Sequence, residues 1–127
     1  MSLVGIGIDV VEIERIRNSI NQFGEPFLKR IFTEAERDYC QAQKRPEIHF
    51  AARFAAKEAI SKAFGTGIGK DLSWLDLEVM RKESGEPSVV LSAVARQYAT
   101  GRGAGDILIS LTHAEHYAAA NAVILRK

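Results

Sequence analysis

The chain has 127 residues, of which 46% are hydrophobic and 26% are charged, and its formal net charge at pH 7 is +1. A chain of this length can form one domain with an ordinary hydrophobic core, so we expect a single domain over residues 1–127. The near-zero net charge provides no positive field over the whole molecule, which argues against nucleic acid as a partner.

Two further features indicate the compartment. Cys40 is the only cysteine, which excludes an internal disulfide and fits a reducing environment. Asp9 interrupts the apolar run near the N-terminus, which is unlike a secretory signal, and no run approaches the roughly 18 apolar residues of a membrane span. We therefore expect a soluble, cytoplasmic protein with no membrane partner.

Residues 3–10 alternate and predict a β-strand. The alternation places four aliphatic side chains on one face: Val4, Ile6, Ile8 and Val10. The other face carries Gly5, Gly7 and then Asp9, and the missing side chains leave room for another element to pass close. Asp9 fits equally well as a functional carboxylate and as the N-cap of a helix that begins directly after it.

Helical spacing of apolar residues continues to Gly24, and Pro26 can open a further short helix. Thr33 and Glu36 form a capping box, which predicts a helix over residues 34–43. Four basic side chains form a loose set on the first two of these helices: Arg15, Arg17, Lys29 and Arg30. Such a set is usually a solvated face, and the sharper alternative is a dock for an acidic partner.

A long helix is predicted over residues 48–64, where no Gly or Pro occurs before Gly65. One side of this helix is made of alanines, which allow close packing: Ala52, Ala55, Ala56, Ala59 and Ala63. Glu58, Ser61 and Lys62 fall together on a different side. The ordinary interpretation is a surface ion pair between Glu58 and Lys62, and the functional one is a face that carries a carboxylate, a hydroxyl and an amine.

Alternation then predicts four strands, over residues 75–80, 88–91, 107–111 and 117–125. Between the second and third of these, Ser92 caps a helix that Gly101 ends. The order of one strand, several helices and then mostly antiparallel strands predicts the α+β class, with a mostly antiparallel sheet packed against the long helix.

Asp9 and Glu58 each end or interrupt an otherwise apolar segment. Two oxygen ligands suit a hard cation such as Mg²⁺, which keeps waters and takes further oxygens from a phosphate substrate. Lys62, one helical turn from Glu58, can neutralise a phosphoryl group or donate a proton to it. Residues 65–69 can cradle phosphate oxygens with backbone N–H groups. Together these are the parts of a phosphoryl-transfer site.

Other motif assignments are weaker. Residues 65–71 lack the Walker spacing and follow a helix rather than a strand, and Gly5 and Gly7 lack the third glycine of a dinucleotide fingerprint. His113 and His116 have no evident third ligand for zinc. His113 is therefore either a solvent-facing turn residue or a phosphate contact.

Segments from the first predicted strand to the last resemble the phosphopantetheinyl transferases. Residues 5–10, followed by Arg15, are similar to the N-terminal motif of that family. Residues 54–67 look like its second motif, K-E-A-x-x-K, in the form typical of its small members. Residues 110–113 and 117–120 are similar to its C-terminal segment, so the resemblance covers the whole length.

The resemblance implies the α+β phosphopantetheinyl transferase fold and a defined activity. Such enzymes move 4′-phosphopantetheine from coenzyme A to a serine of apo acyl carrier protein and release adenosine 3′,5′-bisphosphate, a step that supports fatty acid biosynthesis. By the match, Asp9 and Glu58 would bind Mg²⁺, and Lys62 would stabilise or protonate the departing phosphate. Glu58 would accept the proton of the serine through a water.

The same match implies the ligand contacts. The coenzyme site would be lined by these residues: Lys57, Ser61, Gly65, Thr66, Gly67, Ile68, Pro87 and His113. Arg45 and Arg53 would contact the 3′-phosphate of coenzyme A. Arg15 and Arg17, on the first helix, would meet the acidic carrier protein.

One position distinguishes the small members of the family from the larger ones. Larger, monomeric relatives have an acidic third metal ligand two residues after the motif aspartate, and this chain has Val11 there. The small type is a homotrimer whose sites lie between neighbouring subunits, so the alanine-rich last strand and long helix are expected to face other subunits. Two alternatives stay open: a Mg²⁺-dependent phosphohydrolase or nucleotide-binding enzyme that uses the same side chains, and a non-enzymatic oligomeric adaptor.

Overall fold

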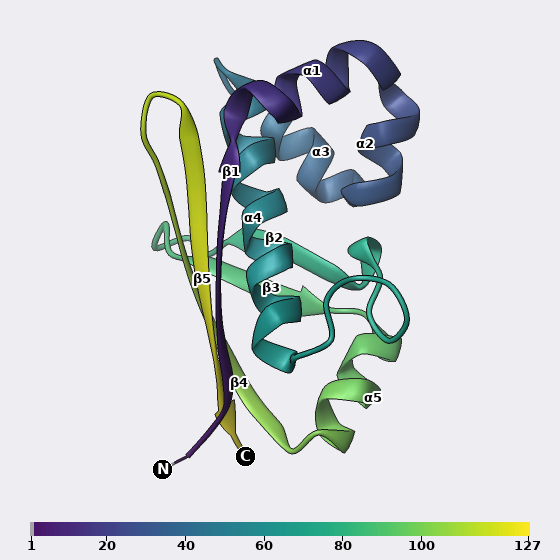
Figure 1. The fold of residues 1–127 in the computed structure, drawn as a ribbon, viewed down its shortest axis with the longest axis vertical. Coiled ribbons are helices and arrows are strands. Elements are labelled where there is room, and N and C mark those ends of the chain that lie inside the picture. The colour runs from purple at the N-terminus through teal and green to yellow at the C-terminus, as the bar shows by residue number, and fades with distance from the viewer. Residues whose placement is uncertain (1) are drawn as a thin grey trace.

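A three-stranded antiparallel sheet and one long helix organise the chain (Figure 1). The computed structural model describes residues 2–127. The sheet has the order β1-β5-β4, formed by β1 (Leu3–Glu12), β5 (Tyr117–Arg126) and β4 (Ala104–His113). Helix α4 (Pro46–Phe64) crosses its inner face. The α+β class predicted from the sequence is therefore confirmed.

The remaining elements are three helices at one end of α4, a hairpin beside its middle and a helix near its other end (Figure 1). Near its N-terminal end lie three helices: α1 (Ile13–Phe23), α2 (Glu25–Ile31) and α3 (Glu34–Gln41). The rest of the chain adds a short 3₁₀ turn, a hairpin and a helix: η1 (Trp74–Asp76), β2 (Leu77–Arg81), β3 (Pro87–Leu91) and α5 (Ala93–Gly101). No helix within residues 2–127 combines the length and apolar character that crossing a bilayer demands.

Two predicted caps are present. Thr33 accepts a hydrogen bond from the Glu36 N–H while the Glu36 carboxylate accepts one from the Thr33 N–H, which completes the capping box of α3. Ser92 accepts a hydrogen bond from the Ala95 N–H at the start of α5. The capping residues therefore predicted the starts of two helices correctly.

The predicted cap at Asp9 is wrong. Strand β1 continues to Glu12, where it pairs with Tyr117 of β5, and α1 begins only at Ile13. Pairing with a strand more than one hundred residues later keeps residues 9–12 extended. The Asp9 side chain is thereby free of a capping role.

Strand β1 approaches the backbone of α4 unusually closely. A Cβ atom added to Gly5 would lie 2.0 Å from the carbonyl oxygen of Ala63, and one added to Gly7 would lie 2.0 Å from that of Ala59. No side chain fits at either position, so the predicted close approach to the glycine face is confirmed and the neighbour is α4.

The alanines of β5 complete this interface. Ala118, Ala120 and Ala122 share the inner face with Gly7 and are buried in a core that also contains the alanines of α4. The expectation that these alanines face other subunits is therefore wrong, because the small side chains of strand and helix pack against each other within the chain. The outer face of the sheet is instead apolar and open, with Ile6, Ile8 and Val10 exposed by 68%, 66% and 59%.

Replacing Gly7 with alanine should strongly destabilise the chain, because the new methyl group meets a helix carbonyl that cannot rotate away. Overpacking of this kind typically costs about 1–3 kcal/mol of unfolding free energy. Thermal unfolding measures the loss. Gly101→Ala is the matched control, since nothing lies within 4 Å of a Cβ there. Equal melting temperatures for the two variants would contradict this packing.

Candidate functional site

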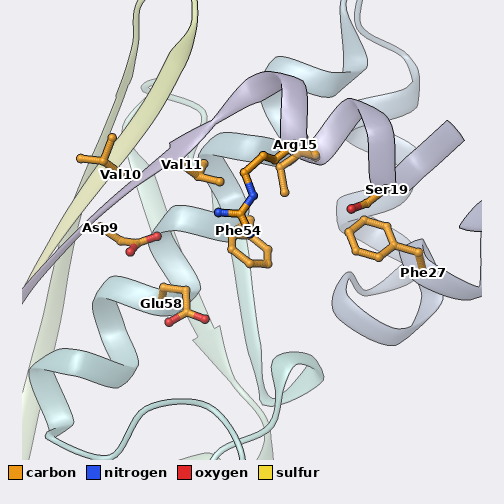
Figure 2. Close-up of a pocket in the computed structure, with 9 residues that line it drawn as sticks. Asp9, Val10, Val11, Arg15, Ser19, Phe27, Phe54 and Glu58 are labelled. Carbon is orange, nitrogen blue, oxygen red and sulfur yellow. The ribbon is translucent and has the colours of Figure 1, made fainter. Parts of the chain in front are cut away.

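Asp9 and Glu58 line one cleft of about 310 Å³ between β1, α1, α2 and α4. Asp9 is the inward-facing residue of β1 that follows Gly7, and Glu58 directly precedes Ala59, whose carbonyl Gly7 approaches. The close packing of strand and helix therefore brings together two residues that are 49 positions apart in the sequence. Figure 2 shows both carboxylate side chains projecting next to one another from β1 and α4.

Lys62 joins this pair from the next turn of α4. Its Nζ donates to Oδ1 of Asp9 at 2.9 Å and to the carbonyl oxygen of Ile8 at 3.0 Å. The sequence suggested an ion pair within the helix between Glu58 and Lys62, but the ion pair that Lys62 forms is with Asp9. The lysine side chain stays about half exposed, so its ammonium remains accessible to a ligand.

The two carboxylates repel each other. The pKa of Glu58 is raised, first by burial and then by the negative charge of Asp9, while the ammonium of Lys62 opposes the shift. A cation that binds both carboxylates relieves this repulsion. The donor set fits a hard, hydrated divalent ion such as Mg²⁺, which takes its remaining oxygens from water and phosphate.

The structure provides no third acidic ligand. Val11 lines the cleft, and no group of three or more His, Cys, Asp or Glu side chains suited to a metal occurs within residues 2–127. His113 and His116, whose spacing alone is a weak zinc signal, belong to no such group in the described residues. Two carboxylates remain the protein's contribution to a cation site.

Aromatic and basic side chains form the walls of the cleft. The ring of Phe54 stacks on that of Trp74, with centroids 4.9 Å apart, and Arg15 extends from α1 toward Phe54 (Figure 2). Phe27 and Ser19 line the opposite side and are shared with an adjoining hollow of about 370 Å³. Sequence reasoning missed Phe54 and Phe27, although Phe54 lies one helical turn before Glu58.

The adjoining hollow has a basic and apolar lining on α1 and α2: Phe23, Pro26 and Arg30 join the two shared residues. Arg17 does not line either space. Its guanidinium lies 2.6 Å from Glu14 and 3.5 Å from Glu47. Of the basic set predicted to meet a partner, Arg15 and Arg30 border the hollows.

The predicted phosphate cradle at residues 65–69 is largely wrong. The N–H groups of Gly65, Thr66 and Gly67 donate to the carbonyl oxygens of Lys62 and Ser61, and that of Gly69 donates to Leu72. The last carbonyls of a helix lack partners within the helix, so the loop satisfies them and commits its donors. Among the loop residues expected in the coenzyme site, Ile68 is half-buried and its neighbours are mostly exposed.

Three further residues expected at the coenzyme are buried on other sides of α4. Ser61 donates to the carbonyl oxygen of Glu58, and Arg53 donates to that of Val79 while stacking over Tyr39. Lys57 has no exposed surface and donates to three interior acceptors. The structure therefore corrects these assignments, because side chains enclosed by the core present no surface to a ligand.

A second group of basic side chains, which includes His49 and His113, lies away from the cleft, at the start of α4 and the end of β4. Burial is the largest cause that lowers the pKa of His49, and three cationic groups add to it: Arg53, His113 and Arg81. His113 and Arg45 are exposed, and Pro87 is half-buried at the start of β3. None of these residues lines the cleft, so one chain holds the predicted coenzyme contacts in two separate places.

Comparisons with known proteins identify the family of this chain. The family model of the 4′-phosphopantetheinyl transferase superfamily matches residues 5–121. A holo-(acyl-carrier-protein) synthase of Chlamydia trachomatis serovar L2 is 48% identical over 121 residues, which cover 95% of this chain and 98% of that protein.

Solved structures match over nearly the whole chain. The crystal structure of a holo-(acyl-carrier-protein) synthase from Neisseria meningitidis superposes with a TM-score of 0.93 at 30% identity, covering 98% of this chain and all of the other. That of a Helicobacter pylori enzyme of the same name, in complex with coenzyme A, gives a TM-score of 0.84 at 33% identity over 94% and 98% of the two chains.

The His49 ring should titrate below the ordinary pKa of 6.5. Because its folded-state pKa is lowered, the unfolded chain binds this proton more readily, so the effect reduces stability as the pH falls below about 6.5. NMR titration of the histidine ring protons measures the midpoint, and His49→Gln assigns the resonance. A midpoint at or above 6.5 would contradict the burial of the ring beside these cationic side chains.

Proposed function

Because this chain belongs to the 4′-phosphopantetheinyl transferase superfamily, we propose that it transfers 4′-phosphopantetheine from coenzyme A to a serine of an apo acyl carrier protein. It is an enzyme of the holo-(acyl-carrier-protein) synthase group. The reaction is Mg²⁺-dependent, releases adenosine 3′,5′-bisphosphate and supports fatty acid biosynthesis. The observation that carries the proposal is the convergence of Asp9 and Glu58 on one cleft, with Lys62 paired to Asp9 beside it.

Asp9 and Glu58 hold the divalent ion, which when bound supplies positive charge to the pyrophosphate of coenzyme A. The serine oxygen of the carrier attacks the β-phosphorus, and the bond from that phosphorus to the bridging oxygen breaks. Glu58 receives the serine proton through a water. Lys62 stabilises or protonates the departing phosphate with its exposed ammonium.

The carrier protein docks on α1 and α2 beside the cleft. Arg15 borders the cleft and Arg30 the adjoining hollow, and both are suited to an acidic surface. Arg17 contributes less, because Glu14 and Glu47 already neutralise it. The apolar hollow between these helices gives the carrier a place to bury side chains near its serine.

The protein acts as a homotrimer whose sites lie between subunits. Ile6, Ile8 and Leu108 form an exposed apolar face on the outer side of the sheet, and an exposed face of this kind is typical of an interaction surface. The separation of His113 and Arg45 from the cleft of the same chain supports the same proposal. In an assembly, these residues and Pro87 of one copy complete the coenzyme site at the cleft of the next.

Incubation with coenzyme A, Mg²⁺ and an apo carrier protein should add the mass of one phosphopantetheine group to the carrier. Asp9→Ala and Glu58→Ala should each abolish this labelling while far-UV circular dichroism stays unchanged. Losing a supporting residue of a metal site typically costs about 10–100-fold in activity, and losing a ligand should cost more. Intact-protein mass spectrometry makes the measurement.

Asp38→Ala provides the matched control, because Asp38 is an exposed carboxylate on α3 outside the cleft. This variant should label the carrier as fast as the unmodified chain. Hydrolysis of coenzyme A without any carrier would instead identify a phosphohydrolase, and full labelling by Glu58→Ala would refute the assigned site.

A charge on the outer face of the sheet should separate the subunits. Ile8→Glu places a carboxylate in the middle of the apolar face, where assembly would bury it without a partner. Light scattering at micromolar concentration should give a trimer mass for the unmodified chain and a monomer mass for this variant. Val94→Glu, at another exposed apolar residue on α5, should leave the trimer intact. A monomeric unmodified chain would overturn the assembly proposal.

A further inference from the structure

Lys57 and Glu36 form an ion pair that has no contact with solvent. Both side chains are 0% exposed, and Nζ of Lys57 lies 2.7 Å from Oε1 of Glu36. A buried pair is tolerated only where hydrogen bonds satisfy its remaining polar atoms. Lys57 also donates to the carbonyl oxygens of Ile31, at 2.7 Å, and Trp74, at 3.0 Å. Glu36 also accepts from the N–H groups of Thr33 and Val79.

Each charge of the pair sits at a helix end of opposite polarity. Ile31 is the last residue of α2, so its carbonyl contributes to the negative end of that helix and attracts the ammonium of Lys57. Glu36 lies in the first turn of α3, where free N–H groups favour a carboxylate. The pair therefore joins the end of one helix to the start of the next and fastens both to α4.

The pair also reaches the cleft through two aromatic rings. Lys57 donates a hydrogen bond to the carbonyl oxygen of Trp74, and the ring of Trp74 stacks on that of Phe54 with centroids 4.9 Å apart. Phe54 and Glu58 lie one turn apart on α4 and both line the cleft. At the other end of the ion pair, Glu36 accepts a hydrogen bond from the N–H of Val79 in β2. A short path of direct contacts therefore connects the buried charges to the surface of the cleft.

We infer that Lys57 and Glu36 are positioning residues, which set the orientation of Phe54 and of the α1–α2 wall relative to Glu58. The inference rests on the proposed transferase function for its kinetic consequence. It differs from a direct contact between Lys57 and coenzyme A, because the ammonium of Lys57 already has three protein acceptors and no exposed surface. Lys57 acts on the reaction through Trp74 and Phe54.

The only tryptophan of the chain, Trp74, reports on this path. In Lys57→Met, loss of the carbonyl anchor should shift the Trp74 emission to longer wavelength and increase its quenching by acrylamide, with far-UV circular dichroism unchanged. Glu36→Gln should give the same shift, because glutamine preserves the capping box but leaves Lys57 without its counter-ion. Lys82→Met is the matched control, since it removes an exposed lysine–glutamate pair.

Kinetic measurements distinguish a positioning role of the ion pair from a direct contact with coenzyme A and from a loss of stability. At a temperature well below the unfolding midpoint, kcat/KM for the carrier should fall at least tenfold in Lys57→Met and Glu36→Gln. The Kd for coenzyme A, measured by calorimetry, should change less than twofold. Glu36 has no exposed surface for any ligand, so its equal effect cannot arise from a lost contact.

A tenfold weaker Kd for coenzyme A in Lys57→Met, with unchanged Trp74 emission, would overturn the inference and assign Lys57 to the ligand. If neither pair variant folds, Trp74→Leu leaves the ion pair intact and should lower kcat/KM for the carrier in the same way. Unchanged kinetics in that variant would equally overturn the inference. Failure of the unmodified chain to label any carrier would instead refute the proposed function, and the fluorescence comparison would still decide whether the pair controls the aromatic stack.

Discussion

The close contact between β1 and α4 is the constraint on which the rest of the structure depends. Two glycines place the strand against the carbonyl oxygens of Ala59 and Ala63, at a separation that excludes any side chain. Asp9, the next inward position of the strand, is therefore held over the helix turn that carries Glu58 and Lys62. The geometry of the candidate site is thus a direct consequence of backbone packing, and the site needs no long loop to position its charges.

Helix α4 carries charged side chains on two different sides, and their charges are balanced in different ways. On the inner side, Lys57 is paired and fully hydrogen-bonded, so its charge stabilises the arrangement of the surrounding helices. On the cleft side, Glu58 keeps a raised pKa beside Asp9, which leaves a repulsion that a cation can relieve. Functional sites commonly retain such unfavourable interactions, while the rest of the fold supplies the stability to hold them.

Sequence reasoning succeeded where a local spacing or a family motif gave a signal, and it failed where a distant partner gave none. The caps at Thr33 and Ser92 and the trio of Asp9, Glu58 and Lys62 were found from spacing and motif. Alternation in β1 gave two faces but not their directions, because the need for close backbone packing turned the glycine face inward and left the isoleucines outside. The ion pair between Lys57 and Glu36 was missed because Glu36, 21 residues earlier, already had a sufficient local explanation as a capping residue.

The central claim is that Asp9 and Glu58 jointly bind a divalent cation together with coenzyme A. The most direct measurement is an anomalous difference map from a crystal grown with Mn²⁺ and coenzyme A, since Mn²⁺ prefers the same oxygen ligands as Mg²⁺. The account predicts an anomalous peak within bonding distance of both carboxylates and of a phosphate oxygen. Coenzyme A bound with no peak at these carboxylates, or with a peak at other residues, would contradict it.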